Sequence, residues 1–223
     1  MCRVRRATSL RGAFLLPLLL LVPASASAQP QQPVGPFVLD VRGVFARHKT
    51  EPDIARSLNV TTPNLPTRSF GLSGGAHWYP WRTTSITLGV GAEVVIAGGS
   101  RMLEPETTTA PAAPAGPTVR RHFRSVAPQV SFNFGHRNGW SYISGGIGRS
   151  TLYVDREDAP TRDAPGRKTI NYGAGARWFT NHHVAFATEI RWYSVAPQDA
   201  TSGGGIAQPR TTLMVLSAGI GLR

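Results

Sequence analysis

The sequence predicts an all-β fold, an eight-stranded antiparallel up-and-down barrel, and three observations lead to this prediction. Apolar side chains recur at every second position in eight separate runs, which is the period of a strand with two unlike faces. The connections between the runs are alternately long and short. After the N-terminal leader, no stretch has the period of a helix. We expect strands at about 38–47, 67–81, 85–96, 121–134, 140–154, 169–179, 184–194 and 211–222.

The connections indicate how these strands are arranged. The short ones are RTT, GHRNG and TNHH, whereas the long ones include stretches such as TEPDIARSLNVTTPNLP and ETTTAPAAPAGPTV. Tight turns join antiparallel neighbours, so all short connections belong at one end of the barrel and all long loops at the other. With an even number of strands, both termini are expected at the end with the tight turns.

The first residues predict export. Four arginines lie within residues 1–12, an apolar run follows at 13–24, and SASA precedes Gln29. This order is typical of a secretory signal peptide, and the apolar run is shorter than the roughly 20 residues of a spanning helix. We expect a signal peptide at 1–28, a Pro/Gln-rich spacer at 29–36 and one barrel domain at 37–223. The sole cysteine, Cys2, lies in the signal peptide, so no disulfide is expected in the processed chain.

The chain is basic, with a formal net charge of +12 from 24 Lys and Arg against 12 Asp and Glu. The basic residues form no continuous stripe and export separates the chain from nucleic acid, so no nucleic-acid partner is expected. The excess positive charge lies largely in the expected loops, where it would suit anionic lipid headgroups.

The two faces of each strand predict which side meets lipid. In the closing strand, Met214, Leu216, Ala218, Ile220 and Leu222 share one face, and the other face holds mostly small residues. In the other strands the less apolar face combines Gly, Ser and Ala with charges of both signs, a mixture unlike a water-exposed surface. It fits the interior of a narrow barrel, where opposite charges neutralise one another. We therefore predict a transmembrane barrel with a polar, side-chain-filled lumen, whose charge network comprises Asp40, Arg42, His77, Glu93, Arg177, Glu189 and Arg191.

Aromatic residues gather beside the short turns. Because Trp and Tyr favour the interface between lipid and water, their position predicts an aromatic belt at the tight-turn end of the barrel. We assign to this belt Trp78, Trp81, Phe134, Trp140 and Trp178.

These features resemble those of the small outer-membrane β-barrels, the family of the OmpA transmembrane domain and OmpX. The motifs that carry the resemblance are the glycine-alternating strands ITLGVGAEVVIAGG, SYISGGIGRSTLYV, INYGAGARWF and LSAGIGLR. The resemblance implies a monomer in the bacterial outer membrane, with long loops outside the cell and tight turns in the periplasm. It implies outer-membrane lipid and lipopolysaccharide as surroundings, and the barrel-insertion machinery as the partner that reads the final strand. The expected role is structural or surface-interacting, and the filled lumen makes a wide diffusion pore unexpected.

Two alternatives remain open from the sequence: a lipid A-modifying enzyme on the same barrel, and a soluble lipocalin-like ligand-binding barrel. A nucleophilic serine needs a base within hydrogen-bond reach, but His77 and Glu93 are expected inside the barrel, and His122 and Ser125 on opposite faces of a strand. We therefore expect no catalytic residues, no cofactor and no metal. A weak cation site at Asp155, Glu157 and Asp158, and a ligand role for the NHH turn at 181–183, are minor alternatives.

Overall fold

The computed structural model describes residues 36–103, 116–135, 139–158, 165–180, 183–199 and 207–223. The predicted signal peptide and all but the last residue of the predicted spacer lie outside these residues. The barrel domain, by contrast, is described from its first strand to its last.

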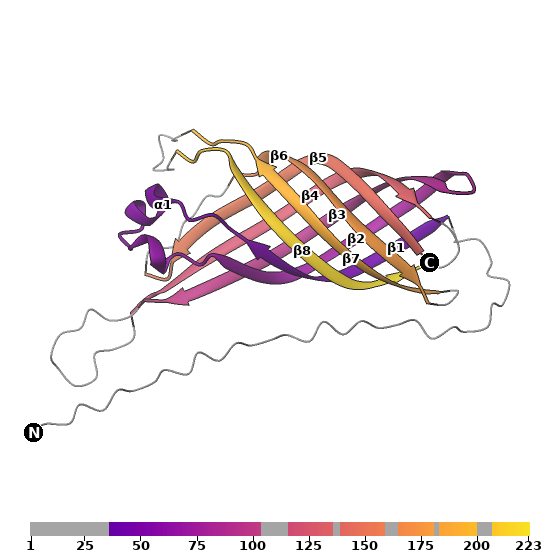
Figure 1. Ribbon diagram of the computed structural model, residues 1–223. Helices are drawn as coiled ribbons and strands as arrows, with labels where there is room; N and C mark the ends of the chain where they lie inside the picture. The colour runs from indigo at the N-terminus through magenta and orange to yellow at the C-terminus, as the bar shows by residue number, and fades with distance from the viewer. Residues whose placement is uncertain (1–35, 104–115, 136–138, 159–164, 181–182, 200–206) are drawn as a thin grey trace, which may run out of the picture. The chain divides into compact units, whose positions relative to one another are not determined.

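Eight antiparallel strands form one closed barrel in which every strand pairs with its neighbour in sequence, and the last pairs with the first (Figure 1). The fold class predicted from the sequence is therefore confirmed. Closure leaves no strand edge without a hydrogen-bonded partner. The strands are β1 (Phe37–Arg47), β2 (Arg68–Arg82), β3 (Ile86–Met102), β4 (Thr118–Phe134), β5 (Gly139–Arg156), β6 (Arg167–Phe179), β7 (Val184–Val195) and β8 (Thr211–Leu222).

Six of the eight strands have both ends within two residues of their predicted positions, but the hairpin of β3 and β4 is longer than expected. Its pairing continues to Met102 opposite Thr118, whereas the predicted runs stop at 96 and start at 121. The apolar alternation that marks a strand ends at Ile96, yet the backbone ladder does not depend on it. The hairpin therefore extends beyond the apolar part of the barrel.

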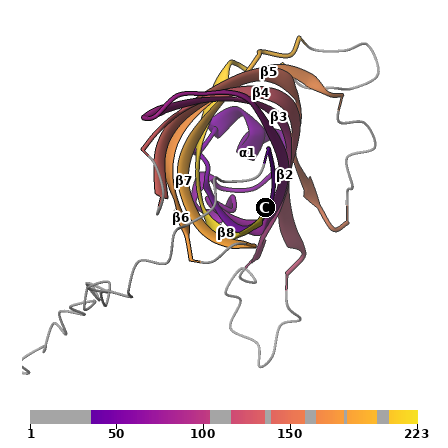
Figure 2. The same cartoon turned by 90° about the vertical axis from the view of Figure 1, so that its right-hand side faces the viewer.

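The first long connection contains a short helix, α1 (Pro52–Ser57), and a 3₁₀ turn, η1 (Thr62–Asn64). The expectation that no helix follows the leader was wrong, because a six-residue helix is too short to show a period. Seen along the barrel axis, α1 lies within the outline of the strands (Figure 2). Its Ile54 and Ala55 are buried with Val119 and Val154 of β4 and β5. Among the described residues, no helix has the length and apolar character needed to cross a membrane.

Outside one bulge, side chains alternate between the lumen and the outer face. In β4, for example, every second residue from Val119 to Asn133 is buried. A bulge in the pairing of β2 with β3 lies between Trp78 and Trp81. This extra residue places both tryptophans on the outer face, although an odd spacing would otherwise separate them.

Candidate functional site: the charged lumen

The inward side chains of β1 mark successive layers of the barrel interior. Beginning at the tight-turn end, Val38, Asp40, Arg42, Val44 and Ala46 all face the lumen and are at most 4% exposed. The layers are in turn apolar, acidic, basic and apolar. The lumen is thus filled along its length by side chains rather than by one polar column.

The middle of the lumen holds four charges of alternating sign, which we call the central network: Arg42, Glu93, Glu189 and Arg191. The guanidinium of Arg42 donates to Glu189 Oε2 at 2.8 Å and to the carboxylate of Glu93. Arg191 pairs with Glu189, and its Nε lies 3.6 Å from Glu93 Oε1. Two cations and two anions therefore close a neutral ring across β1, β3 and β7.

Neutral groups add further hydrogen bonds to this ring. The hydroxyl of Tyr142 donates to Glu189 at 2.7 Å, and that of Tyr193 donates to Glu93 at 2.8 Å. Arg191 also donates to Asn171 and Gln129, the latter at 3.1 Å. Because a buried charge is tolerated only when it is both paired and hydrogen-bonded, these partners explain how the ring can lie in the barrel interior.

A second cluster, which we call the lower network, lies nearer the tight-turn end. Asp40 pairs with Arg177, and Arg177 donates to the hydroxyl of Tyr79. His77 Nδ1 is 3.7 Å from Asp40 Oδ2. Asp40 is thus the acidic group of this cluster and faces two basic side chains.

Glycines of the closing strand provide the space for these long side chains. A methyl group at Gly219 would approach Arg42 Cγ to 2.9 Å, and one at Gly221 would approach Asp40 Oδ1 to 2.6 Å. The small face of β8 noted in the sequence is therefore the wall against which both networks pack.

Apolar layers enclose the two networks. On the long-loop side, Val95, Phe123, Leu152 and Leu213 pack in a buried cluster with their neighbours. This layer differs from the polar lumen expected from the sequence. It arises because the inward positions in the outer half of β3, β4, β5 and β8 are Val, Phe and Leu.

Trp140 closes the tight-turn end from inside, which contradicts its assignment to the outer belt. It is 5% exposed and packs edge-on against the rings of Tyr79 and Phe179, with centroids 4.9 and 5.0 Å away. Its neighbours in the chain, Gly139 and Ser141, take the outer positions. Proximity to a turn indicated the correct end of the barrel, but the glycines of β5 obscured the correct face. The other members of the predicted belt are 44–54% exposed on the outer face: Trp78, Trp81, Phe134 and Trp178.

The structure places all seven residues of the predicted charge network in the lumen, and none is more than 8% exposed. It divides them into two networks, a division that the sequence did not indicate. The tyrosines that complete the networks were missed as well, although their inward position follows from the period of two.

A third group lies at the long-loop mouth, beyond the apolar band of the outer face. His48, one residue past β1, has its Nε2 2.9 Å from the hydroxyl of Ser69. Burial, assisted by the nearby Arg121, lowers the pKa of His48 to about 3. Glu51, just before α1, accepts a hydrogen bond from the hydroxyl of Thr211 at 2.7 Å. These contacts attach the first loop to the rim of the barrel.

The three acidic residues considered as a cation site have separate partners. Asp155 lies 3.4 Å from His122, and Asp158 pairs with Arg156 at 2.5 Å. The hydrogen bond to Thr118 and the charge of Arg120 lower the pKa of Glu157. Within the described residues, no group of three His, Cys, Asp or Glu side chains is arranged to hold a metal. Residues 181 and 182 of the NHH turn lie outside the described part of the chain.

No protein-family model and no curated protein matches this chain. Among solved structures, neisserial surface protein A (NspA) is similar over 84% of this chain and 97% of its own, with 10% identity and a TM-score of 0.51. Outer membrane protein OprG of Pseudomonas aeruginosa matches over 86% and 97% of the two chains, with 9% identity and a TM-score of 0.47. The outer membrane protease OmpT of Escherichia coli matches over 83% and 96%, with 7% identity and a TM-score of 0.43. The likeness to NspA and the closed eight-stranded barrel together show the fold of the small outer-membrane β-barrels.

Proposed function

We propose that the processed chain is an integral outer-membrane barrel with a structural or surface-interaction role, which presents its four long loops outside the cell. The observation that carries the proposal is the reversed distribution of polarity. Leu39, Val41 and Leu72 are 56–64% exposed on the outer face, whereas Arg42 and Arg191 are 2% exposed in the lumen. An apolar surface of this extent is stable in lipid and would associate in water.

The loops, rather than the lumen, are the part available to partners. Trp140 and its ring neighbours close one end of the lumen, two ion-pair networks occupy its middle, and an apolar cluster fills the outer half. Eight strands leave an interior only wide enough for side chains. A wide diffusion pore is therefore not part of the proposal.

The proposed role is not enzymatic. His77 and Glu93, the histidine and acid considered for catalysis, are buried in the lumen and belong to different networks. Neither can reach a lipid substrate on the outer face. The proposed surroundings are outer-membrane lipid and lipopolysaccharide, with the insertion machinery as partner during assembly and no further subunit.

Fractionation with a gel-shift assay tests this proposal. We expect the processed protein in the outer-membrane fraction, released by detergent alone, and migrating faster in SDS before boiling than after it. Release as a folded protein in detergent-free periplasmic extract would contradict the proposal and favour the soluble ligand-binding barrel. Modification of lipid A on expression, abolished by substitution of an outer-rim Ser or His, would favour the enzyme.

A further inference from the structure

The outer face of the barrel carries a ring of cations at one edge of its apolar band. On each strand, one outward residue is the first beyond the apolar band on the side of the long loops. On five of the eight strands that residue is basic, and on none is it acidic. In strand order these residues are Arg47, Arg68, Gly98, Arg124, Arg149, Lys168, Ser194 and Thr212.

Four of these cations face one another directly across neighbouring strands. Arg149 of β5 is opposite Lys168 of β6, and Arg47 of β1 is opposite Arg68 of β2. Like charges at directly opposed positions repel each other and destabilise a sheet. The structure records no ion pair for any of the four among the residues it describes, although it records such pairs for Arg120 and Arg156 farther out. Each basic pair thus lacks a counter-charge within the described chain.

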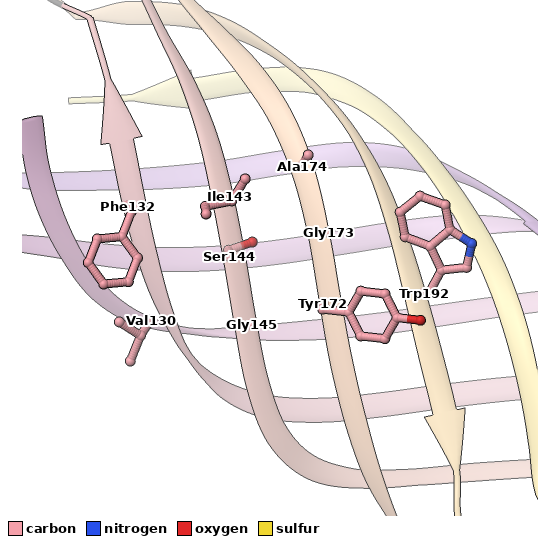
Figure 3. Close-up of a pocket in the computed structure, with 9 residues that line it drawn as sticks. All are labelled: Val130, Phe132, Ile143, Ser144, Gly145, Tyr172, Gly173, Ala174 and Trp192. Carbon is pink, nitrogen blue, oxygen red and sulfur yellow. The ribbon is translucent and has the colours of Figure 1, made fainter.

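A groove lies on the membrane side of the pair formed by Arg149 and Lys168. It has a volume of about 580 Å³. Gly145, Gly173 and Ala174 form its floor, with Phe132 on one side and the Tyr172 and Trp192 rings on the other (Figure 3). Those two rings are stacked, with centroids 5.8 Å apart. The groove is apolar and open to the lipid side, which suits an acyl chain.

The groove and the cations lie on the same strands. Gly145 and Arg149 are four residues apart on β5 and face the same way, as are Tyr172 and Lys168 on β6. At about 3.4 Å per residue, each pair spans about 14 Å along the strand. A lipid headgroup bound by the cations would therefore place its chains over Ile147 and Ile170 and into the groove.

The same combination occurs on the other side of the barrel. A second groove of about 510 Å³ is lined by Phe45, Phe70 and Leu216, among others. Phe45 and Phe70 are the outward residues immediately next to Arg47 and Arg68 on their strands. Both basic pairs have an apolar groove on their membrane side. This repetition argues against a chance arrangement at one pair.

We propose that each basic pair and its groove bind one phosphorylated, acylated lipid of the outer leaflet, the lipid A part of lipopolysaccharide. Guanidinium and ammonium groups are strong donors to phosphate, and Arg149 can donate two parallel hydrogen bonds. Arg124, outward on the strand next to Arg149, adds a third cation at the first site, which favours a headgroup with two phosphates. This inference rests on the proposed orientation, with the long loops outside the cell.

Native mass spectrometry of the processed chain, refolded in a neutral detergent, tests the site with diphosphoryl lipid A and phosphatidylglycerol as probes. We expect lipid A to bind at two sites and phosphatidylglycerol to bind more weakly. The double variant R149Q/K168Q should bind lipid A about tenfold or more weakly at one site, because charged hydrogen bonds are lost. Arg120→Gln is the matched control, because Arg120 faces outward on β4 but is paired with Glu157, and its affinity should not change.

A groove variant separates the chain-binding part from the charges. A Cβ at Gly145 would meet no atom closer than 3.4 Å, so Gly145→Leu should fold while its side chain fills the groove. We expect weaker lipid A binding with unchanged net charge. Equal affinities of wild type, R149Q/K168Q and Gly145→Leu, or equal binding of the two probes, would overturn the inference. The gel shift on boiling reports folding independently, so a folded variant without lipid distinguishes failure of this site from failure of the proposed barrel.

Discussion

The charges inside the barrel and those on its outer edge follow opposite rules. In the central and lower networks, Arg42 lies between two carboxylates and Asp40 faces Arg177, so each charge of these networks has a counter-charge within the chain. On the outer edge, Arg149 faces Lys168 with no recorded counter-charge among the described residues. The comparison indicates that the two lumen networks are neutralised within the chain, whereas the basic pairs on the outer face need a counter-charge from a molecule in the surroundings. The predictions below test both halves, beginning with the largest expected effect.

Removing Asp40, the acidic group of the lower network, should cause the largest loss of unfolding free energy. Asp40→Ala leaves Arg177 as an uncompensated buried cation, which typically costs about 3–5 kcal/mol of unfolding free energy. Reversible urea unfolding in lipid vesicles, followed by tryptophan fluorescence, measures this loss. The double variant Asp40→Leu/Arg177→Met should recover most of it, because a buried pair replaced by apolar groups is often neutral. If the double variant were as unstable as the single one, the cost would come from packing and not from charge.

A charge introduced on the lipid-facing side of the barrel should lower the unfolding free energy by a somewhat smaller amount. Leu216 is an outward residue near the middle of β8, so Leu216→Arg should lower the unfolding free energy by about 2–4 kcal/mol. Thr212→Arg on the same face, near the edge of the band, should cost about 0–1 kcal/mol. The same urea experiment in vesicles measures both variants. Equal costs at the two depths would argue against lipid as the surrounding medium.

His48 makes the long-loop mouth sensitive to acid. Its pKa of about 3 in the folded barrel lies below the ordinary value of 6.5, so the unfolded chain binds the proton more readily. Stability is then full above pH 6.5 and falls as the pH drops toward 3, with a loss of about 2 kcal/mol by pH 5. Unfolding at pH 7 and pH 5 measures this slope, which His48→Gln should reduce. NMR of the imidazole should show a neutral ring at pH 5, and a protonated one would contradict the assignment.

Reversing the charge of Lys168 should have the smallest effect, and it should raise the unfolding free energy where the preceding changes lower it. Lys168→Glu converts a repelling cross-strand pair into an attracting one, which should raise the unfolding free energy by roughly 0.2–1 kcal/mol in neutral detergent. Unfolding in detergent without lipopolysaccharide measures it, with Lys168→Gln as an intermediate. A loss of stability in both variants would show that Lys168 has a partner within the chain.

The architecture could be predicted because period, turn length and strand number are local properties of a chain. The eight runs and their turns established the closed barrel, and alternation alone placed Glu189 and Arg191 inside it. Trp140 shows where this reasoning fails: on β5, Tyr142 and Ile143 lie on opposite faces and glycines follow on both, so either orientation satisfied the pattern. The grouping of the lumen charges into two networks depends on the relative stagger of distant strands, which no local pattern contains. Helix α1 was missed because its burial depends on residues of β4 and β5.

The span of the central network along the chain bears on how the barrel is assembled. Arg42 and Glu189 are 147 residues apart, and their contact exists only once the first and last strands have met. A seam joined two residues out of place would separate these two charges, so Arg42 would keep only Glu93 and Glu189 only Arg191 as its partner. Opposite charges far apart in the polypeptide thus make mispaired closure energetically unfavourable. Correct pairing of the first and last strands is therefore favoured at the final step of barrel formation.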